Sequence, residues 1–235
     1  MNPSITSHGT TQIRPSLPIQ ATHPAYTTVE KVLLACGILS SFYYIAINIF
    51  VPLQYAGYSL TSQTISELSA INAPTRSLWV LLCTFYSLLV IAFGWGIWKV
   101  AGENRKLLII SIVMMIYGIS GFFWPPMHQR QVLATGGGTM TDTMHIVFTA
   151  VTVALMLIML ISGAATFGKR FRYYSVATIM VLLAFGILTG ISSPAMAKNL
   201  PTPMIGVWER INIGVFMLWV IVFASVLLHK EKSTG

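Results

Sequence analysis

Long apolar stretches without any Asp, Glu, Lys or Arg dominate the pattern of this chain. They cover residues 32–66, 77–98, 107–129, 143–168, 173–197 and 211–229. A helix that crosses the hydrocarbon core of a bilayer, about 30 Å thick, needs about 20 apolar residues. Each stretch meets this requirement, and none alternates apolar and polar positions as the strands of a membrane barrel do. The pattern therefore predicts six transmembrane helices.

We expect an all-α, polytopic membrane protein built as a six-transmembrane-helix bundle. The helices are predicted at about residues 32–54, 77–99, 107–125, 142–166, 173–194 and 208–229, inside a transmembrane domain of residues 29–229. Residues 1–28 are polar, rich in Ser, Thr and Pro, and without an apolar core, which is typical of a flexible tail. Residues 230–235 are expected to form a short cytoplasmic tail.

The composition supports this interpretation and excludes most soluble classes of protein. The chain is 55% hydrophobic and 9% charged, whereas an ordinary soluble domain is roughly 25% charged. The net charge of +8 alone would suggest a nucleic-acid partner. Nucleic-acid binders, however, are normally rich in charge of both signs. We therefore expect the lipid bilayer as partner and no nucleic acid.

The placement of the basic residues predicts the orientation of the bundle. Ten fall on one side of the predicted spans: Arg14, Lys31, Lys99, Arg105, Lys106, Lys169, Arg170, Arg172, Lys230 and Lys232. Four fall on the other side: Arg76, Arg130, Lys198 and Arg210. The positive-inside rule then places both termini in the cytoplasm. The prediction is a multi-pass protein of the cell membrane whose longer loops face outward.

Most remaining ionisable residues lie in the outer loops or in the first outer turn of a helix. Six of them are predicted to line an outward-facing polar pocket: Glu67, His128, Asp142, His145, Glu209 and Arg210. Charged groups that converge at one membrane depth indicate a functional site. We expect this pocket to bind a small molecule, a lipid headgroup or an ion. The geometry requires the segment 62–70 to fold over the bundle mouth and to bring Glu67 near Arg210 or His145.

An alternative is a membrane-embedded enzyme, such as a lipid-active hydrolase or transferase. Asp142 and His145 are three residues apart and share one helical face. His145 would act as a general base or metal ligand oriented by Asp142, and Arg210 would stabilise an anionic headgroup or oxyanion. Ser66 and Ser69 are candidate nucleophiles. The chain contains no nucleophile-elbow or zincin motif that would support this alternative.

Metal and structural alternatives also remain open. His128 and His145 are weak candidates for zinc ligands, because their spacing matches no established zinc signature. They are also candidates for the axial ligands of a b-type haem. In a purely structural or assembly protein, Asp142 and Glu209 would serve as helix-start acids, and Glu67 would close a capping box with Thr64. Charge-translocating transport is disfavoured, since no ionisable residue falls at the middle of a span.

Several segments together resemble one family. They are Gly57-Tyr58-Ser59, Thr64-Ile65-Ser66-Glu67-Leu68-Ser69-Ala70, Ala73-Pro74, Trp124-Pro125, Asp142-Thr143-Met144-His145 and Gly206-Val207-Trp208-Glu209-Arg210-Ile211. In this order they resemble an uncharacterised six-helix integral membrane family, the domain of unknown function nine-nine-eight, over about residues 30–229. That family often has an acidic residue shortly after the proline that ends the third helix, where this chain has His128. The resemblance implies the topology and no activity.

Overall fold

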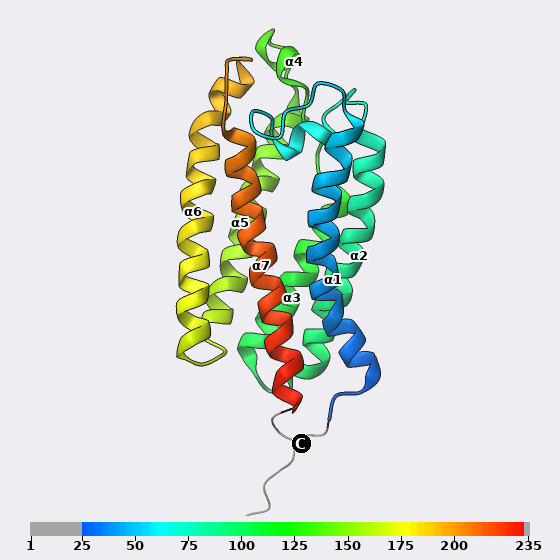
Figure 1. Ribbon diagram of the computed structural model, residues 1–235, viewed down its shortest axis with the longest axis vertical. Coiled ribbons are helices and arrows are strands. Elements are labelled where there is room, and N and C mark those ends of the chain that lie inside the picture. Colours follow the sequence, from blue (N-terminus) through cyan, green and yellow to red (C-terminus); the bar gives the residue numbers. More distant parts are fainter. Residues whose placement is uncertain (1–24, 233–235) are drawn as a thin grey trace, which may run out of the picture.

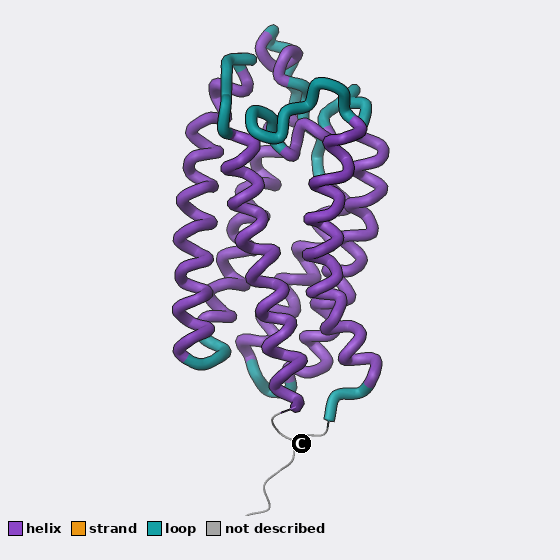
Figure 2. The backbone as a smooth tube through the Cα atoms, viewed as in Figure 1, coloured by secondary structure: helices purple, strands orange, loops and turns teal. Residues whose placement is uncertain are grey.

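The computed structural model describes residues 25–232, which form helices and loops without any strand (Figures 1 and 2). Six helical segments in this part are long and apolar enough to cross a membrane. The long helices are α1 (Thr28–Phe50), α2 (Arg76–Ala101), α3 (Arg105–Ser120), α5 (Met140–Ala164), α6 (Lys169–Ala197) and α7 (Ile205–Lys232). The shorter ones are η1 (Val51–Gln54), η2 (Ile65–Ser69), η3 (Gly121–Phe123) and α4 (Arg130–Ala134). The predicted all-helical membrane fold is confirmed.

Local signals explain where the helices begin and end. The helix α1 begins at Thr28, earlier than the predicted start at residue 32. Thr27 and Glu30 form a capping box at this point, in which Thr27 N donates to Glu30 Oε2 at 2.8 Å. The third span ends at Phe123, since Trp124 is extended ahead of Pro125. The predicted tail of residues 1–28 falls almost entirely outside the described residues. α7 continues to Lys232, past the predicted end at residue 229, and residues 233–235 lie outside the described part.

The six long helices pack as a closed ring. In order around the ring, α1 contacts α2, α2 contacts α3, α3 contacts α5, α5 contacts α6, α6 contacts α7, and α7 returns to α1. The interior is filled by large apolar side chains, among them Phe93, Phe216, Trp219 and Phe223, which are fully buried. The rings of Trp219 and Phe223 stack with centroids 4.9 Å apart. Aromatic and aliphatic side chains therefore fill the centre of the helical ring.

The two ends of the bundle differ. Both described chain ends lie at one end, together with the short turns at 102–104 and 165–168 (Figure 1). The other end carries a layer of loops and short helices, drawn mostly in teal at the top of Figure 2. We call this layer the cap and define it as residues 51–75, 121–139 and 198–204. That the cap faces outward remains the prediction of the positive-inside rule.

Candidate functional site

The short helix η2 is the centre of the cap and lies within the segment 62–70 that was expected to cover the bundle mouth. A 3₁₀-helix has about 3.0 residues per turn, so consecutive side chains diverge by about 120°. Three consecutive residues of η2 contact three different elements, Ile65 through its backbone and Ser66 and Glu67 through their side chains. The backbone N–H of Ile65 donates to Glu209 on α7, Ser66 contacts His145 on α5, and Glu67 contacts Arg130 on α4.

Glu67 and Arg130 form a buried, two-pronged ion pair. Arg130 Nε donates to Glu67 Oε1 at 2.8 Å and Nη2 donates to Oε2 at 2.7 Å. The side chains are only 11% (Arg130) and 5% (Glu67) exposed. Glu67 Oε2 also accepts from Thr64 N at 2.7 Å, which completes the capping box that the sequence indicated. Glu67 therefore pairs with Arg130, a residue outside the predicted set of six, and with neither Arg210 nor His145.

Arg130 also ties the cap segments to one another. Its Nη2 donates to the carbonyl oxygen of Ser62 at 3.1 Å, and its Nη1 donates to Thr202 Oγ1 at 3.2 Å. One guanidinium thus connects the 55–75 loop with the loop before α7. The sequence placed Arg130 among the four basic residues of the predicted outer side and gave no signal for its partners.

Ser66 and His145 form the most distinctive contact in the cap. Ser66 Oγ lies 3.0 Å from His145 Nε2, and His145 Nδ1 lies 2.8 Å from the carbonyl oxygen of Pro125. Because a carbonyl oxygen only accepts, Nδ1 carries a hydrogen, and in the neutral ring Nε2 accepts the Ser66 hydroxyl hydrogen. The His145 side chain is buried, with 7% exposure, and the edge-on ring of Trp124 packs against it at 5.4 Å between centroids.

Asp142 contacts His128 rather than orienting His145. Asp142 Oδ1 accepts from the backbone N–H of His128 at 2.6 Å, and Oδ2 lies 2.9 Å from His128 Nδ1. The same carboxylate caps α5 by accepting from Thr139 N at 2.7 Å. The helical spacing places Asp142 and His145 one turn apart as expected. The Asp142 oxygens are nevertheless engaged by the cap loop and by the helix start, so Pro125 holds the His145 ring instead.

Arg210 is bonded only to neutral groups. Its guanidinium donates to the carbonyl oxygens of Leu60, Gln63 and Gly206 at 2.9, 3.2 and 2.9 Å, and to the hydroxyl of Tyr58 at 2.7 Å. No ion pair joins it to a carboxylate in the part of the chain described here. Burial raises the pKa of the Tyr58 hydroxyl, although the nearby Arg210 charge opposes this. Tyr58 therefore remains neutral, and Arg210 interacts electrostatically with Glu209 without a direct ion pair in the described residues.

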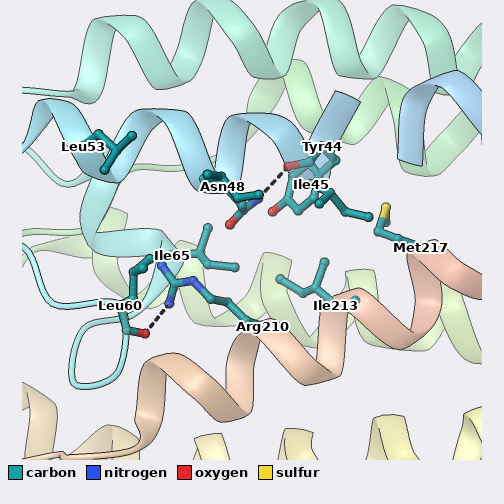
Figure 3. Close-up of a pocket in the computed structure, with 11 residues that line it drawn as sticks. Tyr44, Ile45, Asn48, Leu53, Leu60, Ile65, Arg210, Ile213 and Met217 are labelled. Carbon is teal, nitrogen blue, oxygen red and sulfur yellow. Dashed lines mark hydrogen bonds between the residues drawn. The ribbon is translucent and has the colours of Figure 1, made fainter. Parts of the chain in front are cut away.

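A pocket of about 320 Å³ lies beside Arg210, between α1 and α7 (Figure 3). It is lined by Tyr44, Ile45, Asn48, Ile49, Leu53, Leu60, Ile65, Arg210, Ile213, Gly214 and Met217. Of the six residues predicted to line a polar pocket, Arg210 alone reaches this largely apolar one. The other five are bonded to each other, to the backbone or to neighbouring cap residues. Arg210 Nε and Asn48 Oδ1 are buried and have no hydrogen-bond partner within residues 25–232.

The metal and haem alternatives find little support in the ligand arrangement. Within residues 25–232, no three His, Cys, Asp or Glu side chains gather as a metal site would require. Both ring nitrogens of His145, and Nδ1 of His128, are already engaged in hydrogen bonds. Binding a metal or haem iron through His145 would therefore require one of its present contacts to break.

Comparison with known proteins adds one match. The model of a family described as "Protein of unknown function (DUF998)" matches residues 38–226, which include the whole cap and most of the helical ring. Comparison with curated proteins gave no match. Comparison with solved structures gave none either.

Proposed function

The chain belongs to the DUF998 family, whose function is unknown, and we propose that this multi-pass membrane protein binds an anionic amphiphile in the α1–α7 pocket. The observation that carries the proposal is the buried Nε of Arg210, which has no hydrogen-bond partner within residues 25–232 and lies at the edge of an apolar cavity. A partly buried cation that is not ion-paired attracts an anion more strongly than an exposed one, since burial weakens the screening by water.

The pocket has the size and lining of a ligand site. Its volume of about 320 Å³ falls in the usual range of roughly 300–1,000 Å³. Ligand pockets are mostly apolar with a few polar groups that fix orientation, and here Tyr44, Asn48 and Arg210 are the polar members of the lining. This lining suits a molecule that is apolar over most of its length and polar at one end.

The membrane is the source of such a molecule. The lining residues Ile45, Ile49 and Leu53 are 40%, 63% and 75% exposed, so the pocket is open on the α1 side. These residues lie on a membrane-spanning segment, where an exposed apolar side chain faces lipid. An amphiphile can enter sideways from the leaflet next to the cap, with its headgroup at Arg210 and its chain along α1.

The unpartnered atoms define what the headgroup has to offer. Arg210 Nε carries a hydrogen and needs an acceptor. Asn48 Oδ1 is an acceptor and needs a donor, whereas the amide nitrogen of Asn48 already donates to Tyr44 O at 3.0 Å. Figure 3 shows both side chains at the space between α1 and α7. A headgroup with an acidic oxygen and a hydroxyl supplies both, which favours an acidic, hydroxyl-bearing lipid over a zwitterionic one.

The test is retention of defined lipids by the purified full-length protein, measured by native mass spectrometry. We expect phosphatidylglycerol to be retained at least 10-fold more than phosphatidylcholine of equal chain length, and inorganic phosphate not to compete. Gly214→Leu should abolish this preference. Gly214 lines the pocket, and a Cβ added there would have no atom within 4 Å, so the larger side chain fills the cavity and leaves the cap contacts intact.

Arg76→Gln serves as the matched control, because Arg76 lies at the same end of the bundle and outside the pocket. Equal retention of both lipids by the wild-type protein would refute the proposal. Undiminished preference in the Gly214→Leu variant would show that the lipid binds elsewhere, and would also refute it.

A further inference from the structure

We infer that Ser66 and His145 form a nucleophile–base pair that cleaves or transfers carboxylic esters of membrane amphiphiles. The distance of 3.0 Å between Ser66 Oγ and His145 Nε2 lies within the roughly 2.6–3.2 Å at which a base activates a hydroxyl nucleophile. The hydroxyl belongs to η2 in the cap and the imidazole to the first turns of α5. The fold thus brings the two groups together across 79 residues of sequence.

The base is held in the required tautomer and orientation. Pro125 O accepts from His145 Nδ1 at 2.8 Å, the position at which a third group orients the base in nucleophile–base–orienter arrangements. The Trp124 ring packs edge-on against the imidazole and restricts its rotation. Asp142, one turn earlier on α5, is engaged by His128 and Thr139, so the Pro125 carbonyl is the group that orients the base.

The structure distinguishes between the two candidate serines. Ser69 Oγ donates to the carbonyl oxygen of Ser66 at 3.1 Å and is buried at 8% exposure. Ser66 is more exposed than Ser69 and is the serine that reaches an imidazole nitrogen. Ser66 is therefore the nucleophile, whereas the Ser69 hydroxyl is directed to a backbone carbonyl.

The chemistry balances with these two residues, the ester and water. Ser66 Oγ attacks the ester carbonyl carbon while its proton moves to His145 Nε2. The bond from the carbonyl carbon to the alcohol oxygen then breaks, and the leaving alcohol takes the proton from Nε2. Water attacks the acyl-Ser66, gives a proton to Nε2, and that proton returns to Ser66 Oγ as the carboxylic acid leaves. An alcohol in place of water gives acyl transfer.

The position in the membrane indicates the substrate class. The pair lies where α5 begins and the cap ends the bundle, beside Trp124, a residue type enriched at membrane interfaces. The boundary between headgroups and acyl chains lies at this depth, and lipid esters are found there. Ser66 meets His145 at α5, whereas the pocket of the proposed function lies between α1 and α7. The inference is therefore independent of what the pocket binds.

The test is labelling of the purified full-length protein by a fluorophosphonate probe, which reacts with activated serines. We expect one adduct, mapped to Ser66 by peptide mass spectrometry. Ser66→Ala should remove it, and His145→Gln, which keeps a hydrogen-bonding side chain without a base, should slow labelling at least 100-fold. Ser69→Ala is the control and should label at the wild-type rate. A folded wild-type protein that remains unlabelled at Ser66 would overturn the inference.

A second measurement covers the case in which Ser66→Ala fails to fold. In a background with Cys36 and Cys83 replaced by serine, Ser66→Cys places a thiol beside His145. An imidazole base activates a thiol, so iodoacetamide should alkylate it at least 10-fold faster than the thiol of Ser69→Cys. Equal alkylation rates in the two folded variants would show that the Ser66–His145 contact is structural only, and would overturn the inference.

Discussion

Replacing Arg130 by alanine is expected to lower the unfolding free energy by about 3 kcal/mol. Removing one partner of a buried ion pair typically costs about 3–5 kcal/mol, because the other charge is left buried. The lower end applies here, since Glu67 would keep its contacts with Thr64 N at 2.7 Å, Thr64 Oγ1 at 3.1 Å and Gln63 Nε2 at 3.3 Å. The bonds from Arg130 to Ser62 O and Thr202 Oγ1 would also be lost.

The assay is reversible unfolding in mixed micelles, followed by tryptophan fluorescence, for a double-mutant cycle. Glu67→Gln, Arg130→Ala and the combined variant should give a coupling free energy of about 2 kcal/mol between the two side chains. Lys198→Ala is the control. Lys198 is an exposed cation at the same end of the bundle, and its loss should change stability by less than about 0.5 kcal/mol.

A cost below about 1 kcal/mol for Arg130→Ala would refute this reasoning, because that is the range of solvent-exposed pairs. It would mean that water reaches the pair and that the cap opens readily. A large cost in both single variants with no coupling would also refute it. In that case each side chain would stabilise the cap through its other contacts.

Three further predictions concern the cap and its orientation. Gly206→Ala should lower the unfolding free energy by about 2 kcal/mol, because a Cβ there would overlap the carbonyl oxygens of Leu60 and Gln63 that accept from Arg210. Gly214→Ala on the same helix is the control. A Cβ at Gly214 would have no atom within 4 Å, so this change should be neutral or stabilising by up to about 1 kcal/mol. Since burial raises the pKa of Tyr58 in the folded state, the folded protein holds this proton more tightly than the unfolded chain. Unfolding free energy should therefore fall as pH rises above about 10, and Tyr58→Phe should reduce that slope in denaturation at about pH 8 and 10.5. A single cysteine at Gly136 should react with an impermeant maleimide added outside intact cells, whereas one at Arg105 should react only after the membrane is permeabilised. The reverse result would mean that the predicted topology is inverted.

Helix number was predictable because it depends on local composition. A stretch of about 20 apolar residues has few stable alternatives to a membrane-spanning helix, and all six stretches became such helices. Helix ends were less predictable, since they depend on single caps such as Thr27 and on the extended residue before Pro125. The capping box of Thr64 and Glu67 was also visible in the sequence, because both partners lie within four residues.

Partners in the cap were not predictable because they come from distant segments. Glu67 and Arg130 are 63 residues apart, and Ser66 and His145 are 79 residues apart. The local spacing favoured an Asp142–His145 pair, yet Asp142 accepts two bonds from His128, a loop residue that follows Pro125 and Pro126. The charged residue types indicated which cap residues were candidates for the site, but the fold determines which of them contact one another.

The geometry of η2 explains why the cap depends on so few residues. Three consecutive positions, Ile65, Ser66 and Glu67, each bond to a different helix, Ile65 through its backbone N–H and the other two through side chains that the 3₁₀ turn separates by about 120°. The same turn directs Ile65 into the α1–α7 pocket and Ser66 toward His145. The ion pair of Glu67 therefore has a positional role, because it fixes the rotation of η2 about its axis. If that rotation changed, the pocket wall and the Ser66 hydroxyl would both move, so stability, lipid retention and probe labelling depend on one turn of helix.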